Sequence, residues 1–203
     1  MPLQRISGAM VSDSTITSAD VQDGSLTGAD VQDGGLGRAD VGESLIRLSS
    51  AQATQSGTFK DFTGIPSWAR RVVLMLYGVS TSGTSDILVQ LGVGSTPTAS
   101  GYINGTSIFS YASGIAATTS TAGIPIFNNL ASYVYTGRVA MELLEPGVNN
   151  WVVTATLASS SGFYAAVTSS GVAPLSGALG MVRLTTASST PTFDAGYASI
   201  SWE

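Results

Sequence analysis

The sequence predicts a mainly β protein, in which a β-sandwich or jelly-roll-like domain follows a short repeat segment. From Phe59 onward, short apolar or alternating runs are separated by turn-forming residues, and no convincing amphipathic helix occurs. Before Phe59 the chain repeats itself and contains no tryptophan, tyrosine or phenylalanine. We therefore expect two domains, 1–58 and 59–203, with a boundary in the polar, turn-rich stretch around 48–58.

The N-terminal segment repeats with a period of ten residues, as in "ITSADVQDGS" from Ile16 and "LTGADVQDGG" from Leu26. A branched apolar residue recurs every five positions. Five residues advance a helix by about 140° and reverse the face of a strand, so neither straight element keeps these residues on one side. The chain must turn between them, and Asp-Gly at 23–24 and 33–34 favours such turns. We expect one inward assembly row, which consists of Ile16, Val21, Leu26, Val31, Leu36 and Val41.

The units "ADVQD", "GSLTG" and "ADVGE", within about residues 9–48, resemble the pentapeptide repeat family. The resemblance implies a β-helix-like segment, although every second unit has Gly or Ser in place of Ala before the central residue. About two coils cannot bury a continuous face alone, so we expect the row to pack against other chains or a larger particle. The alternative is an extended stalk or arm that orders on assembly.

The repeat also places Asp20, Asp30 and Asp40 at equivalent outward positions. A carboxylate ladder could bind Ca²⁺, but the spacing of a calcium loop is absent. Turn formation and a solvated face explain the same carboxylates, and we favour that interpretation. We therefore expect neither a metal site nor a cofactor.

In the second domain we expect six to nine strands. The clearest candidates are apolar or alternating runs of strand length, at 71–79, 86–93, 138–145, 151–158, 179–186 and 196–203. The first is apolar almost throughout and is predicted to be buried. Alternation directs Val139 and Met141 inward and Ala140 outward, and it places Trp151 and Leu157 on one face. The last run predicts that the C-terminal residues pair within the sheet.

The composition argues against an enzyme and against a nucleic-acid-binding protein. Charged residues make up 10% of the chain, whereas an average domain has about 25%, and the net charge is −5. The Lys and Arg residues form no basic stripe. Without cysteine or histidine, the chain lacks thiolate ligands and the commonest general base. Asp61 and Asp194 form the one acidic pair that we cannot assign to a structural position, which leaves a polysaccharide-cleaving enzyme as the least favoured hypothesis.

Two stretches, 99–127 and 159–171, combine aromatic rings with small polar residues. Such compositions make adaptable contact surfaces, and flat rings stack on sugars. The candidate receptor contacts are Tyr102, Phe109, Tyr111, Phe163 and Tyr164. The alternative is that these rings lie in the core or at a subunit interface within long loops.

The block "DFTGIPSWARRVVLMLYGVSTSGTSDILVQLG" (61–92) and the ending "LGMVRLTTASSTPTFDAGYASISWE" (179–203) resemble a domain of bacteriophage and prophage fibre-type proteins. The resemblance implies a non-enzymatic virion structural protein of fibre or spike type, a homotrimer with a β-sandwich knob. It also implies an N-terminal segment attached to other virion proteins and a knob that faces the host, where a surface glycan is a candidate partner. The alternative is a capsid decoration or head-fibre protein.

These properties together predict where the protein is made and works. No apolar run is long enough to cross a bilayer, and no secretory signal is evident. We expect synthesis in a bacterial cytoplasm without nucleic-acid binding or membrane insertion, and the resemblance to fibre-type proteins implies a host cell and a final location in the virion.

Overall fold

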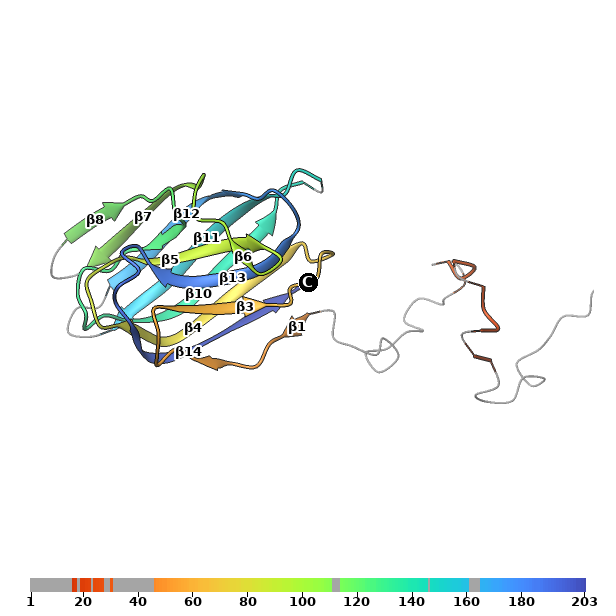
Figure 1. The fold of residues 1–203 in the computed structure, drawn as a ribbon, viewed down its shortest axis with the longest axis horizontal. Coiled ribbons are helices and arrows are strands. Elements are labelled where there is room, and N and C mark those ends of the chain that lie inside the picture. Colours follow the sequence, from red (N-terminus) through yellow and green to blue (C-terminus); the bar gives the residue numbers. More distant parts are fainter. Residues whose placement is uncertain are drawn as a thin grey trace, which may run out of the picture. The chain divides into compact units, whose positions relative to one another are not determined.

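The computed structural model describes residues 16–17, 19–22, 24–27, 30, 46–110, 114–145, 147–160 and 165–203. Strands dominate the part from residue 46 onward (Figure 1). Their bounds are β1 Arg47–Leu48, β2 Gln52–Ala53, β3 Phe59–Thr63, β4 Arg71–Thr81, β5 Ile87–Val93, β6 Thr96–Pro97, β7 Ile103–Ser110, β8 Gly114–Thr118, β9 Ile124–Ile126, β10 Val134–Leu143, β11 Asn150–Ser160, β12 Ala165–Pro174, β13 Leu179–Thr186 and β14 Phe193–Trp202.

Within the described residues these strands form two antiparallel sheets. The larger sheet has the order β1-β14-β4-β10-β11-β12-β7-β8, and β2 also pairs with β14. The smaller sheet has the order β3-β13-β5-β6, and β9 also pairs with β5. Figure 1 shows the smaller sheet lying over the larger one, and side chains from both form one buried hydrophobic core. This architecture confirms the predicted mainly β, sandwich-like fold. In the described part of the chain, no helix is long and apolar enough to span a membrane.

Every strand predicted from apolar periodicity is present. The alternation along β11 is confirmed, since Trp151 and Leu157 are both buried. Along β10, Val139 and Met141 are buried as predicted, but Ala140 is buried too. Its short side chain lies between register partners on β4 and β11, which shield it.

The prediction for 71–79 needs a correction, because β4 is buried on one face only. Val72, Leu74 and Leu76 are buried, whereas Met75 is half-buried and Tyr77 is exposed. The strand is apolar on both faces, but only one face reaches the core between the sheets. The other face belongs to the outer surface of the larger sheet.

Several strands lie in stretches where the sequence pattern predicted no strand. β7 and β8 fall within 99–127, and β12 falls within 159–171 and continues to Pro174. The number of strands in the described part therefore exceeds the six to nine expected. These strands extend the larger sheet beyond β11 and give it most of its width.

The sandwich begins earlier than the composition suggested. The chain divides into the units 1–44 and 45–203. In the second unit, β1 and β2 both pair with β14, and the Thr54 amide donates to the Gly196 carbonyl (2.9 Å). Most of the stretch around 48–58 is thus part of the sheet edge instead of a linker. Its polar residues suit an exposed edge, which explains why composition alone did not assign it to the sandwich.

Two glycines shape the contact between β4 and β14. Gly78 and Gly196 have φ values of 66° and 90°, in the region that favours glycine. The register between the strands shifts here, as in a β-bulge. A Cβ on Gly196 would lie 2.4 Å from the Gly78 carbonyl oxygen. The backbones can therefore approach this closely only because position 196 has no side chain.

Gly196→Ala should destabilise the sandwich by at least about 2 kcal/mol, because it adds both backbone strain and a backbone clash. Gly105→Ala is a matched control, since a Cβ at Gly105 in β7 meets no atom within 4 Å. The free energy of unfolding, measured by urea denaturation of the two variants and the wild type, tests this. Equal stability of the two variants would contradict the bulge argument.

Candidate surface-contact site

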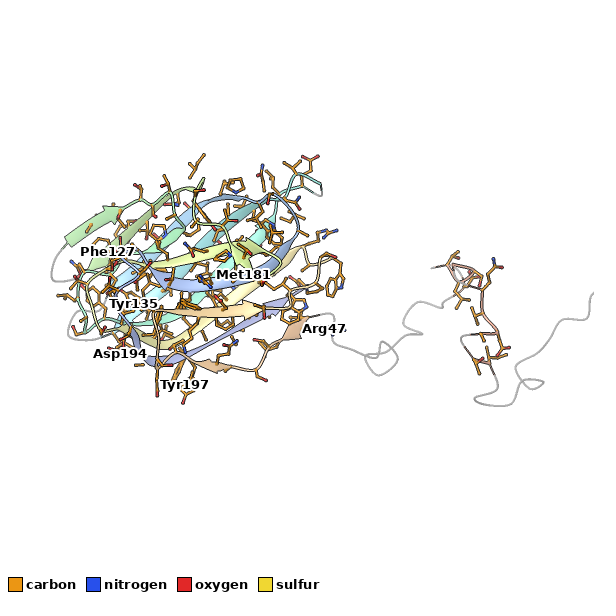
Figure 2. The ribbon with its side chains drawn as sticks, in the orientation of Figure 1. Arg47, Phe127, Tyr135, Met181, Asp194 and Tyr197 are labelled. Carbon is orange, nitrogen blue, oxygen red and sulfur yellow. The ribbon has the colours of Figure 1, made fainter. Side chains whose placement is uncertain are left out.

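The candidate site lies on the outer face of the larger sheet, where β4 and β14 run side by side. Tyr77 of β4 and Tyr197 of β14 are register partners, so their side chains point to the same face. Their exposed fractions are 72% and 48%, large values for tyrosines within paired strands. Figure 2 shows Tyr197 pointing away from the sandwich, whereas Tyr135 lies between the layers. We call these two exposed residues the tyrosine pair.

The local backbone explains how the tyrosine pair is held. Each tyrosine is adjacent to one of the two left-handed glycines, Gly78 and Gly196. The bulge formed there turns the following backbone, and bulges re-aim neighbouring side chains. The Gly78 amide donates to the Thr136 hydroxyl of β10 (3.1 Å). This hydrogen bond holds the bulge from the side of β4 that is opposite β14. The rings are thus presented by a rigid, hydrogen-bonded scaffold.

A shallow hollow of about 100 Å³ accompanies the tyrosine pair. Its lining contains no Asp, Glu, Lys or Arg and consists of Ala51, Met75, Leu76, Tyr77, Tyr197, Ala198 and Ser199. Phenol rings offer apolar faces for stacking and hydroxyl groups for hydrogen bonds. The arrangement suits a flat, neutral, hydroxyl-bearing ligand.

Of the two predicted receptor contacts that the structure describes, one lies at the surface. Phe109 is exposed on the outer face of β7, where its register partner is Ile115 of β8. Tyr111, Phe163 and Tyr164 lie outside the described residues. The strand ends beside them do lie together, because Ser110 and Ala165 are register partners.

The prediction that Tyr102 is a receptor contact is wrong, because its side chain is 2% exposed and belongs to the core. The Leu91 amide donates to its hydroxyl (2.7 Å). That hydroxyl lies within hydrogen-bonding distance of the carbonyl oxygens of Thr98 (3.0 Å) and Leu91 (3.2 Å). The ring fills the core while the hydroxyl satisfies polar backbone groups of β5 and the loop after β6. Tyr102 therefore cannot serve as a surface contact.

Only part of the predicted assembly row can be placed. Ile16 and Leu26 are exposed and Val21 is half-buried, while Val31, Leu36 and Val41 lie outside the described residues. The described residues between 16 and 30 include turns at residues 19–20, 24 and 30 and contain no strand. Ile16 and Leu26, the two largest of the three residues of the row that can be placed, are thus left exposed by the chain itself. Burial of the row against another molecule stays a prediction.

The repeated aspartates take part in turns, as we favoured. The Asp20 carboxylate accepts hydrogen bonds from the amide (2.9 Å) and hydroxyl (2.7 Å) of Thr17. Asp30 accepts the same pair from Thr27 (2.8 and 2.7 Å). In each case the hydrogen bond from the threonine hydroxyl, and secondly the one from its amide, lowers the pKa of the aspartate. Asp40 lies outside the described residues. In the described parts of the chain, no three acidic side chains gather as a metal site would require.

The acidic pair considered for catalysis has structural partners. Asp61 of β3 forms a two-pronged ion pair with the Arg183 guanidinium of β13 (2.6 and 2.7 Å). The Phe59 ring lies 4.1 Å from the Arg183 guanidinium carbon, and the hydrogen-bonded Asp61 raises the pKa of Arg183. Asp194 accepts a hydrogen bond from the Ser80 hydroxyl. The two carboxylates thus lie on different sheets, each with its own neighbour.

No family model, no curated protein and no solved structure matches this chain.

The tyrosine pair is not evident from the sequence alone, although part of its signal is present there. In β4 the buried residues have even numbers from Val72 to Leu76, so Tyr77 falls on the outward face by parity. The register that places Tyr197 beside it depends on the pairing of strands far apart in the sequence. That pairing has no local signature.

Tyr102→Phe should lower the free energy of unfolding at pH 7 by about 1–3 kcal/mol, because it leaves the buried Leu91 amide without its partner. Burial raises the pKa of Tyr102 to about 12, above the ordinary value of about 10. A folded-state pKa above the unfolded one means that the stabilisation is present below pH 10 and lost between about pH 10 and 12. The wild type should therefore lose more stability than Tyr102→Phe over this range.

Urea denaturation at several pH values checks this, with Tyr77→Phe as the exposed control. The control should follow the wild type at every pH. If Tyr102→Phe also followed the wild type at pH 7, the hydroxyl would have no structural role.

Proposed function

We propose that this chain is a non-enzymatic virion structural protein of fibre or spike type, whose sandwich contacts the host surface. The tyrosine pair is the observation that carries the proposal. Two large rings on neighbouring strands are left exposed beside an uncharged hollow. We propose a neutral surface glycan as the partner, since sugars offer apolar faces to rings and hydroxyl groups to phenols and serines.

The resemblance to fibre-type proteins supports the same proposal. The block 61–92 supplies β4 and most of β3 and β5, and the ending 179–203 supplies β13 and β14. These strands are neighbours, because β13 lies between β3 and β5 and β14 pairs with β4. The two stretches that resemble the fibre-type domain thus form one structural unit. The homotrimer that the resemblance implies, and location in the virion, belong to this proposal.

The N-terminal unit is proposed to attach the chain to other virion proteins through the assembly row. Ile16 and Leu26 are exposed branched side chains in a segment whose turns are held by local hydrogen bonds. Burial of such side chains against a partner would contribute roughly 1.5–3 kcal/mol each. Repetition at a fixed period would multiply that contribution along the partner.

Loss of one ring from the tyrosine pair should weaken glycan binding about tenfold. Stacking on a ring contributes on the order of 1 kcal/mol in addition to the burial of its area, and 1.4 kcal/mol corresponds to a factor of ten. We would measure the binding of the full-length protein to immobilised neutral oligosaccharides from bacterial surfaces, with Tyr77→Ala and Tyr197→Ala. Thr154→Ala, on the same outer face at β11, is the control.

Weaker binding by both tyrosine variants and unchanged binding by the control would support the proposal. Binding that none of the variants alters would rule out the tyrosine pair as the contact. If the protein instead bound emptied, tail-free capsids and no glycan, the capsid decoration function would replace the host-contact function.

Val21→Asp should reduce incorporation into particles, because it places an unpaired charge at a half-buried position of the assembly row. Gln22→Asp adds the same charge at the neighbouring exposed position and should have little effect. The fraction of protein that sediments with purified particles distinguishes the two variants. Normal sedimentation of Val21→Asp would show that the row is not the attachment surface.

A further inference from the structure

The outer face of β7 and β8 combines protruding apolar side chains with a hollow. Ile103 and Ile115 are 78% and 72% exposed, and Phe109 is about half exposed. Ile103 and Phe109 lie on the same face of β7, because their positions differ by six, an even number, and the strand period is two. Ile115 of β8 is the register partner of Phe109 and so shares that face. We call this area the β7–β8 surface.

The hollow lies between the two ends of the β7–β8 surface. Its volume is about 430 Å³, and it is lined by Gly105, Thr106, Ser107, Ala117, Thr118 and Thr119. Gly105 contributes to it, since nothing lies within 4 Å of where its Cβ would be. The hollow is large enough for the side chain of an isoleucine or phenylalanine. A surface with both protrusions and a hollow offers the two unlike parts of a heterologous contact, in which the protrusion of one copy enters the hollow of the next around a ring.

β8 is also an edge strand without the usual protection. Within the described residues it pairs only with β7, and Figure 1 shows it at the outer margin of the larger sheet. Its sequence, "GIAAT", contains neither a charged residue nor a proline. Proteins usually place charges or prolines on edge strands to prevent association with another chain. An unprotected edge indicates a surface that another chain covers.

The distribution of charged residues indicates which kind of partner fits the β7–β8 surface. The strands β7, β8, β11 and β12 contain no Asp, Glu, Lys or Arg, although the whole chain carries a net charge of −5. A strongly charged partner would find no complementary group on this half of the larger sheet. A second copy of the chain would bring an equally neutral surface, and the two copies would meet without like-charge repulsion at the contact.

We infer that the β7–β8 surface is where copies of this chain contact one another. This inference rests on the self-association included in the proposed function and assigns it to one surface. An apolar side chain of one copy enters the hollow beside Gly105 of its neighbour. Phe109, which we first considered as a receptor contact, then serves the subunit interface.

The test is the solution mass of the full-length protein, measured by light scattering over a range of concentrations. The wild type should have a multiple of the 20.6 kDa chain mass. Ile115→Lys and Gly105→Lys should shift the mass towards one chain, or raise the dissociation constant at least tenfold. Gly105→Lys places its side chain in the hollow without a backbone clash. Ile46→Lys is the matched control, because Ile46 is also exposed but immediately precedes β1, at the opposite edge of the larger sheet.

Far-UV circular dichroism of each variant confirms that the sandwich is folded before its mass is compared. Dissociation of both edge variants with an unchanged control supports the inference. A multimeric wild type that only Ile46→Lys dissociates, or that none of the variants dissociates, overturns the assigned surface but leaves self-association intact. A monomeric wild type overturns both. Glycan binding by Tyr77→Ala is a separate measurement, so the host-contact proposal can fail independently.

Discussion

The pairing of β14 with β4 is the interaction on which the rest of the sandwich depends. It joins the last strand to one of the first, and the other edge of β14 holds both β1 and β2. Without β14, β4 would become an edge and the core would lose the buried side chains of Phe193 and Ile200. Arg71 at the start of β4 binds Glu203 (2.9 Å) just beyond β14. Because this pairing spans most of the second unit, the sheet can be completed only after the whole unit has been synthesised.

Apolar periodicity was sufficient to predict the strands that fill the core with large side chains, such as β10, β11 and β13. It failed for β7 and β12 because their inward positions include hydroxyl groups. Ser169 is buried, and its hydroxyl donates to the Thr106 hydroxyl (2.7 Å) and lies 2.6 Å from the Pro125 carbonyl oxygen. These hydrogen bonds remove the cost of burying the polar groups. A pattern search based on hydrophobicity counts such positions as exposed and therefore predicts a loop.

The candidate site shows the same division between local and long-range information. Aromatic rings in stretches rich in small polar residues predict surface contacts, and Tyr102 is one of these rings. Its ring nevertheless fills the core, because the hydroxyl finds partners at Leu91 and Thr98. Tyr77 and Tyr197 lie in strands that look like ordinary core strands, and only the register between β4 and β14 makes them a pair. Parity along a strand can identify an outward ring, but the position of a second ring beside it is a tertiary property.

The two proposed contacts can be occupied at the same time because the larger sheet separates them. The order β4-β10-β11-β12-β7 places four strand spacings between Tyr77 and the β7–β8 surface, which is about 19 Å at the usual spacing. Charged residues follow the same division of the larger sheet. Arg71, Arg138 and Glu142 all lie on β4 or β10, while the strands from β11 to β8 are neutral. Bringing a neutral half-sheet against another neutral surface removes no ionised side chain from water, which would otherwise be costly. Copies joined through the neutral half would leave the tyrosine pair of each copy exposed. Several weak glycan contacts on one assembly would then engage the same host surface. Once one copy is bound, the effective concentration of glycan near the other copies is higher than a single copy would meet.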